Sequence, residues 1–224
     1  MKIHIFGASG SGTTFLGSKL SQHFGFPHFD ADDYYWKKTE VPFTKKNSLE
    51  ERHDLLQGDL KELRGWVISG SMDSWSEPYS SLFDYAIFLE LDPKIRKERL
   101  KERKDLQYGA RVLPGGDMFD ETEHFIKWAE QYEEGLLEGR SRSRHNRWMK
   151  SLSCPVIKIV NDGTKTELMK RVLVEIDKTQ IRYSLSPFNE IPDDFEELVI
   201  QSKREGFHFV EKMKNQWLSG ENKF

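Results

Sequence analysis

The chain has 224 residues, of which 37% are hydrophobic and 32% charged, and its formal net charge is −3. This length suits one α/β domain with a small appendage, and no apolar run is long enough to cross a bilayer, so we expect no membrane association. The slight negative charge argues against a nucleic-acid partner. A single cysteine, Cys154, excludes an internal disulfide. Because Met1 leads directly into a predicted strand, we expect a cytoplasmic protein without a signal peptide.

The N-terminus predicts a strand, a glycine-rich loop and a helix in immediate succession. Residues 2–6 have strand character, the loop contains Gly7, Gly10 and Gly12, and an apolar helical repeat begins at Phe15. Glycines let the backbone turn tightly and direct successive N–H groups at one anion, to which the helix N-terminus adds its positive end. This arrangement is typical of a phosphate-binding loop.

One position of this loop departs from the phosphate-loop pattern. The spacing Gly7-x4-Gly12-x-Thr14 fits every fixed position except the lysine, which is replaced by Thr13. We expect the backbone N–H groups to hold phosphates and the Thr14 hydroxyl to ligate magnesium. The predicted nucleotide-binding residues are Gly7, Ser9, Gly10, Ser11, Gly12, Thr13 and Thr14.

Two other interpretations of the loop remain open, namely a dinucleotide-binding Rossmann loop and a purely structural glycine turn. Asp30 lies about where a Rossmann protein places its ribose-binding acid. The strict Gly-x-Gly-x-x-Gly register is absent, however, because Phe15 occupies its last glycine position. The adjacent hydroxyls of Thr13 and Thr14 favour a phosphate loop, since a hydroxyl there can hold magnesium.

Further strands and helices alternate along the chain. Strands are predicted at residues 26–30, 66–70, 84–91 and 156–160, and a loop at 34–47. Ser48-x-x-Glu51 is a capping box that opens a helix to about residue 63, and Asp92-Pro93 begins another. Later helices are expected at about 121–137 and 164–177. Strands alternating with helices predict an α/β fold with a mostly parallel sheet covered on both faces.

Two aspartates follow the second predicted strand, which we expect to neighbour the phosphate loop. Ligands of open α/β sheets bind at the carboxyl ends of the strands, so Asp30 and Asp32 are candidates to hold the water shell of magnesium or to orient an acceptor. Solvated turn residues are the alternative interpretation. Asp33 is interpreted as a surface residue.

A long insert precedes the last strand and reads as a helical lid at about residues 105–150. It contains the hinge sequence Pro114-Gly115-Gly116 and ends in an arginine-rich run at 140–147. Guanidinium groups match the oxygens of a transferring phosphoryl group, and at most two arginines of the run can face one ligand. The predicted catalytic residues are Asp30, Asp32, Arg103, Arg140 and Arg144, whereas Arg96 and Arg99 are expected on a charged helix face.

The glycine loop, residues 29–36, the turn at 68–70 and the arginine-rich lid together resemble the small P-loop kinases, in particular adenylate-kinase-like bacterial proteins, over residues 1–178. The resemblance implies a five-stranded parallel sheet of the P-loop nucleoside-triphosphate hydrolase and kinase fold. It also implies that ATP and Mg²⁺ bind at the loop and that the γ-phosphate passes to a small acceptor. Arginines suit a nucleoside monophosphate, whereas Asp30 suits a free hydroxyl. A nucleotide-binding protein without catalysis and an NAD(P)-dependent oxidoreductase are the alternatives.

Residues 179–224 are expected to form a mostly helical extension. Residues 181–185 read as a strand and 193–205 as a helix, and an apolar stripe follows at Phe207, Val210, Met213 and Trp217. Residues 205–224 resemble the opening of GNAT-type acetyltransferases, but the chain stops before their glycine-rich loop, so we expect no acetyl transfer. An exposed stripe of this size would be unfavourable, so we expect it to pack on the kinase-like domain or to pair two chains as a homodimer.

The missing lysine predicts weak binding of a nucleoside triphosphate, with a dissociation constant of about 10 μM to 1 mM. Thr13→Lys should strengthen binding by roughly 1–2 kcal/mol, the scale of a charge-assisted hydrogen bond, if no other cation occupies that space. Calorimetric titration of both proteins with ATP and magnesium measures the difference. An unchanged affinity would mean that another cation is already there, or that the loop is not a phosphate site.

Overall fold

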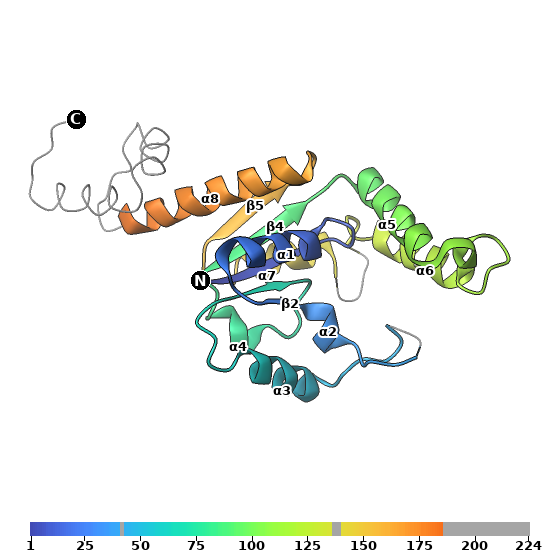
Figure 1. Ribbon diagram of the computed structural model, residues 1–224, viewed down its shortest axis with the longest axis horizontal. Helices are drawn as coiled ribbons and strands as arrows, with labels where there is room; N and C mark the ends of the chain where they lie inside the picture. The colour runs from blue at the N-terminus through green and yellow to red at the C-terminus, as the bar shows by residue number, and fades with distance from the viewer. Residues whose placement is uncertain (41–42, 136–139, 186–224) are drawn as a thin grey trace, which may run out of the picture. The chain divides into compact units, whose positions relative to one another are not determined.

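The computed structural model describes residues 1–40, 43–135 and 140–185, with the backbone only at 181–185. A five-stranded sheet in the order β2-β3-β1-β4-β5 has every neighbouring pair parallel (Figure 1). This confirms the predicted α/β fold with five parallel strands. The strands are β1 Lys2–Gly7, β2 His28–Asp30, β3 Trp66–Ser69, β4 Tyr85–Glu90 and β5 Val156–Val160.

The strand order corrects one expectation and weakens one alternative. β2 pairs with β3 and not with β1, so the strand that carries Asp30 is separated from the glycine-loop strand by β3. Parallel pairing depends on crossover connections, whose spatial order is not encoded in any single strand. In the Rossmann order, β1 lies beside β2. The order found here therefore disfavours the dinucleotide-binding interpretation.

The helices begin and end largely where local signals place them. The capping box of Ser48 and Glu51 is present, Asp92 caps the helix that starts at Pro93, and Gly25 ends the first helix with a φ of 70°. The short helices α2 and α4 and the helix α7 were not predicted. The helices are α1 Thr13–Phe24, α2 Ala31–Tyr35, α3 Leu49–Leu60, α4 Glu77–Ser80, α5 Pro93–Tyr108, α6 Phe119–Glu130, α7 Arg142–Met149 and α8 Lys165–Leu185.

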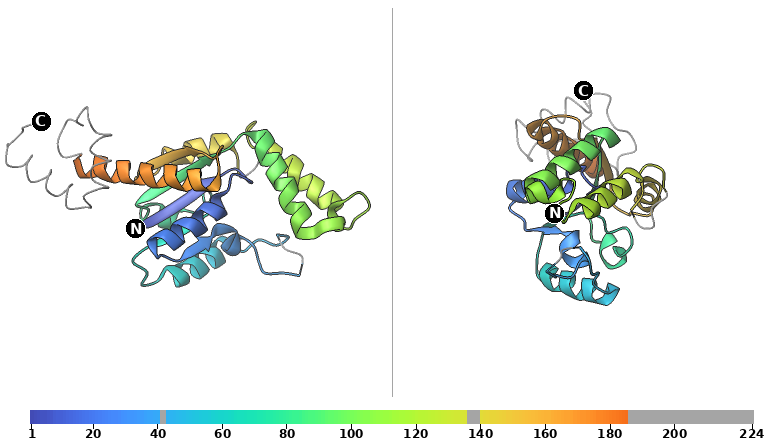
Figure 2. Two further views of the ribbon diagram at one scale, coloured as in Figure 1. Left: turned by 45° about the horizontal axis from the view of Figure 1, so that its top comes forward. Right: turned by 90° about the vertical axis from the view of Figure 1, so that its right-hand side faces the viewer.

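The predicted lid region has two different parts. Helices α5 and α6 lie side by side beyond the end of the sheet (Figure 2) and share a small apolar cluster of Leu100, Ile126 and Ala129. Helix α7, in contrast, packs against the core of the sheet. His145 is fully buried, Met149 is 8% exposed, and the Trp148 ring lies 4.7 Å from that of Phe6. The arginine-rich end of the insert is therefore anchored to the core.

The segment after β5 is one long helix. α8 runs to Leu185, so the strand predicted at residues 181–185 is wrong. No glycine or proline lies between Thr164 and Leu185, and helix propagation there overrides the local strand preference. The chain divides into two compact units, Met1–Met169 and Lys170–Phe224, and the boundary expected after residue 178 lies in the same helix. The predicted helix at 193–205, the apolar stripe and the GNAT resemblance lie outside the described residues.

The loop predicted at 34–47 also needs correction, because its first residues are helical. Asp30 accepts a hydrogen bond from the backbone N–H of Asp32 at 3.1 Å and so caps α2. The remainder folds back on itself, with an antiparallel bridge between Trp36 and Lys46. Side-chain capping by an aspartate that also ends a strand is a local signal that the aromatic, basic composition obscured.

The core contains a titratable ring that should make stability depend on pH. His4 is fully buried and stacks on Phe6 and Phe83, with ring centroids at 5.5 and 5.1 Å. Burial, and secondarily the charge of His145, lowers the pKa of His4 from 6.5 to about 3. Below pH 6.5 the unfolded chain gains a proton at this residue while the folded protein does not, so stability falls as the pH drops toward 3.

The variant His4→Phe should remove this contribution. When the pH falls from 7 to 5, the free energy of unfolding should decrease in this variant by about 2 kcal/mol less than in the unmutated protein. Urea denaturation at both pH values measures this difference. The exposed His23→Gln variant is the matched control and should follow the unmutated protein. Equal losses in the unmutated protein and His4→Phe would show that His4 is not a neutral buried ring.

Candidate functional site

The glycine loop joins β1 to α1 at the carboxyl edge of the sheet. Gly10 and Gly12 have φ values of 83° and 98°, which glycine adopts without strain, and the Ser11 N–H donates to the Ala8 carbonyl at 3.0 Å. Ser11 is fully buried, and its hydroxyl has no hydrogen-bond partner among the described residues. The loop thus has the tight turn that a phosphate cradle needs.

The ends of two neighbouring strands pack against the back of this loop. Asn161, which directly follows β5 and is 5% exposed, donates from Nδ2 to the Ser11 carbonyl at 2.8 Å. A Cβ atom on Gly12 would lie 2.9 Å from that Nδ2, and one on Gly7 would lie 2.5 Å from the Leu89 carbonyl oxygen. Larger residues would therefore displace the loop. Sequence reasoning missed Asn161, although a polar residue immediately after a strand at this edge is a usable signal.

Asp30 contacts the start of α1 directly. The Thr14 hydroxyl donates to Asp30 Oδ2 at 2.8 Å, and the Ser69 hydroxyl lies 3.5 Å from the same oxygen. Ser69 in turn lies 2.9 Å from His28 Nε2, and burial lowers the pKa of His28. Because Ser69 ends β3, it fills the space between β1 and β2. The structure therefore brings the predicted residues Thr14 and Asp30 together, although their strands are not neighbours.

Asp32 is influenced by the charges of two arginines, Arg140 and Arg103. Arg140 donates from Nη1 to the Ser9 hydroxyl at 3.1 Å, and its Nη2 lies 3.7 Å from Asp32 Oδ1. Burial raises the pKa of Asp32, the charges of Arg140 and Arg103 lower it, and neighbouring carboxylates raise it. The Asp32 side chain is 45% exposed, so water moderates this shift. Arg103 is exposed and makes no salt bridge with a described residue.

Arg96 is not on an exposed helix face as expected. It is 2% exposed, donates from Nη1 to the Ser9 carbonyl at 3.3 Å, and pairs through Nη2 with Glu133 at 2.5 Å. A buried guanidinium requires such partners, because removing it from water is costly. Arg96 thus holds the glycine loop from behind. Its spacing within α5 resembles that of the solvated arginines, which is why the sequence does not distinguish it.

Arg144 contacts a carboxylate and not the glycine loop. It forms an ion pair with Asp73, whose side chain is 5% exposed. Ser71 donates to Asp73 at 2.9 Å, so His145 Nε2–H must donate to Ser71 at 3.0 Å and His145 Nδ1 must accept from Tyr132 at 2.9 Å. Burial lowers the pKa of His145 to about 3, in agreement with this neutral ring. This series of hydrogen bonds fixes α7 beside the loop that follows β3.

The residues at the loop fit a nucleotide with magnesium. Among the described residues, no group of three or more His, Cys, Asp or Glu side chains is arranged to hold a metal. Magnesium bound with a nucleotide needs only one or two protein ligands, because phosphates and waters complete its octahedron. The Thr14 hydroxyl offers such an oxygen while it donates to Asp30, and the buried Ser11 hydroxyl, which has no partner among the described residues, lies within the loop. The positive charge of the pattern's lysine is missing at Thr13.

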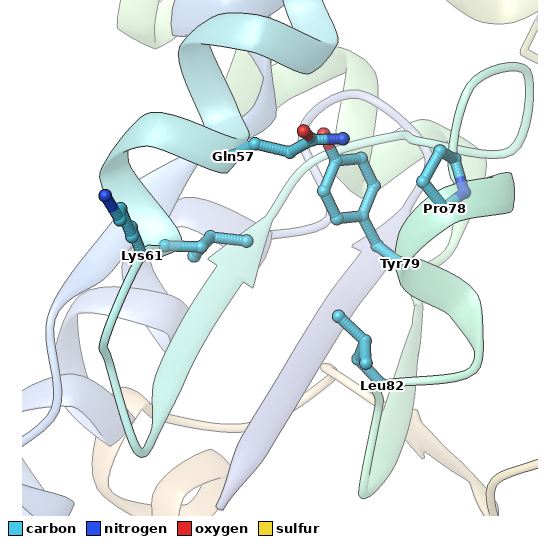
Figure 3. Close-up of a pocket in the computed structure, with 6 residues that line it drawn as sticks. Gln57, Lys61, Pro78, Tyr79 and Leu82 are labelled. Carbon is cyan, nitrogen blue, oxygen red and sulfur yellow. The ribbon is translucent and has the colours of Figure 1, made fainter.

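A separate pocket of about 280 Å³ lies between α3 and α4 (Figure 3). Its lining contains none of the predicted site residues, so we do not assign it to the nucleotide site. The lining residues are Gln57, Leu60, Lys61, Pro78, Tyr79 and Leu82.

In the described part of the chain, no helix is both long enough and apolar enough to cross a membrane.

One protein family and two individual proteins are similar to this chain in sequence. A family described as an AAA domain matches residues 3–121. The uncharacterized protein YqaC of Bacillus subtilis (strain 168) is 43% identical over 171 residues, covering 76% of this chain and 94% of that protein. A probable gluconokinase from Xenopus tropicalis is 26% identical over 132 residues, covering 46% of this chain and 70% of its own length.

Among solved structures, two shikimate kinases are similar to this chain. The one from Bacteroides thetaiotaomicron has a TM-score of 0.46 at 18% identity, covering 79% of this chain and 97% of its own. The one from Aquifex aeolicus vf5 has a TM-score of 0.46 at 16% identity, and the match covers 79% of this chain and 96% of that protein's chain.

The AAA match at residues 3–121 includes the glycine loop, Asp30 and the first four strands, and the chain therefore belongs to the AAA domain family.

Proposed function

We propose that this protein is a P-loop phosphotransferase that moves the γ-phosphate of ATP to a hydroxyl group of a small acceptor. The observation that carries this proposal is the 2.8 Å hydrogen bond from the Thr14 hydroxyl to Asp30 at the end of the glycine loop. It joins a magnesium-ligating hydroxyl to a carboxylate directly beside the helix N-terminus that attracts phosphate. Both groups are needed for phosphoryl transfer.

Each part of the site has a chemical role in this proposal. The loop N–H groups bind the phosphates of ATP, and bound Mg²⁺ neutralises charge on them. Thr14 would ligate the ion, and Asp32 would hold its water shell. Asp30 orients the acceptor and accepts its hydroxyl proton while the new oxygen–phosphorus bond forms and the bond to ADP breaks. The Asn161 and Arg96 side chains keep the loop in place.

The charge distribution favours an acceptor without a phosphate group. Arg142 and Arg144 could bind the phosphate of a nucleoside monophosphate, expected from the adenylate-kinase likeness, only by leaving Glu90 and Asp73. A hydroxyl acceptor requires only a carboxylate such as Asp30, and the similarity to a probable gluconokinase supports this choice. The arginine–carboxylate pairs at the base of the lid are Arg140–Asp32, Arg142–Glu90 and Arg144–Asp73.

The second candidate is a nucleotide-binding protein with weak or lost catalysis. The observation that favours it is Thr13, because the loop lysine normally bridges the phosphates that separate during transfer. Magnesium-dependent ATP binding is expected for both candidates and not for an oxidoreductase. Release of ADP in the presence of an acceptor panel is expected only for the phosphotransferase.

Thr14→Ala should reduce the magnesium dependence of ATP binding, because the variant lacks the hydroxyl that ligates the ion. Titration of ATP with and without magnesium measures this ratio. Thr14→Ser is the matched control, since it keeps a hydroxyl and should retain the dependence. If Thr14→Ala keeps the full magnesium effect, then Thr14 is not a ligand.

Asp30→Asn should lower the turnover number by about 10²–10⁴-fold, the usual contribution of a general base, while ATP affinity changes only a few-fold. Coupled detection of ADP with polyols, sugar acids and nucleoside monophosphates as acceptors measures turnover. The exposed neighbour Asp33→Asn should retain activity. Full activity of Asp30→Asn would remove Asp30 from the chemistry.

A further inference from the structure

The glycine loop lacks its lysine, so a triphosphate at this site requires positive charge from another residue. We propose that Arg140 occupies the role of the missing lysine by binding the terminal phosphate oxygens of the nucleotide. This inference rests on the proposed function. The observation that supports it is the hydrogen bond from Arg140 to Ser9 in the loop, two residues that are 131 positions apart in the sequence.

Two arginines reach Ser9, and their partners differ. Arg96 donates to the Ser9 carbonyl, is 2% exposed and is held by Glu133 at 2.5 Å, so it has little freedom to bind a ligand. Arg140 donates to the Ser9 hydroxyl, its side chain is 22% exposed, and its carboxylate partner Asp32 lies 3.7 Å away. That separation exceeds a hydrogen bond, so N–H groups of Arg140 are available to an anion.

Other cations near the loop are less suitable. Arg142 and Arg144 form close ion pairs with Glu90 and Asp73. The Lys165 ammonium lies over the Phe15 ring, 5.1 Å from its centre. Arg103 contributes charge at Asp32 but makes no hydrogen bond or ion pair with a described loop residue. Arg140 is therefore the arginine that combines loop contact with loose pairing.

Arg140 is also held in place by the core. It directly precedes Ser141, which caps α7 by accepting from the Arg144 N–H at 3.3 Å. The Arg142 N–H donates to the Tyr132 carbonyl at 2.9 Å, and α7 is anchored by the buried His145. The backbone beside Arg140 is thus positioned without any closure of α5 and α6. A cation placed this way matches a loop lysine, which also needs no moving segment.

The test is a double-mutant cycle on the full-length protein, with the affinities for magnesium-ATP and magnesium-ADP measured by calorimetry. Arg140→Ala should weaken ATP binding by about tenfold or more and ADP binding by less, because the terminal phosphate loses its partner. Thr13→Lys should restore ATP affinity in the Arg140→Ala background and change it by less than about threefold in the unmutated protein. Arg140→Lys should retain part of the affinity.

The outcomes separate this inference from the proposed function. If the unmutated protein binds no magnesium-ATP, the proposed function fails. If it binds ATP and Arg140→Ala binds equally well, or if Thr13→Lys gives the same gain in both backgrounds, only the role of Arg140 is overturned. Arg111→Ala, which removes an exposed arginine paired with Asp117, is the matched control and should leave both affinities unchanged. Melting temperatures of all variants verify that each protein is folded.

Discussion

Ser69 at the end of β3 lies where the glycine loop and Asp30, the two parts of the candidate site, approach each other. β3 lies between β1 and β2, so the glycine loop and Asp30 approach each other only across this strand. Ser69 is fully buried, lies 3.5 Å from Asp30 and 2.9 Å from His28, and leaves room for Thr14 to reach the same carboxylate. A larger side chain at this position would separate the loop from Asp30, because the core there is closely packed.

Ion pairs connect several of the elements around the loop. Arginines from α5 and from the start of α7 pair with carboxylates from other elements, and two of these groups, Arg96 and Asp73, are buried. A buried charge is tolerated only with a partner, so each pair restricts where its helix can lie. Arg140 is the exception, because its partner Asp32 is distant and half exposed. The loosest of these pairs is thus the one whose arginine also donates to the Ser9 hydroxyl.

The anchoring of α7 divides the predicted lid into parts with different freedom. α5 and α6 share only a small apolar cluster, whereas α7 buries His145 and Met149 against the sheet. Local opening has a lower free-energy cost where few apolar contacts are lost. Motion of α6 and of the later part of α5 is therefore compatible with a fixed Arg140, whereas the start of α5 is held at the loop by the buried Arg96.

The sequence by itself determined the glycine loop, the five strands and the capped starts of α3 and α5, because these features depend on backbone conformation and on residues within a few positions. It also predicted Thr14 and Asp30 as site residues, and the structure brings these two side chains into contact. Only the tertiary structure decided that β3 separates β2 from β1, that Arg96 is buried while Arg140 reaches Ser9, and that Asn161 supports the loop. These contacts join residues far apart in the chain, and identical arginines become buried or accessible according to which carboxylate the fold places beside each one.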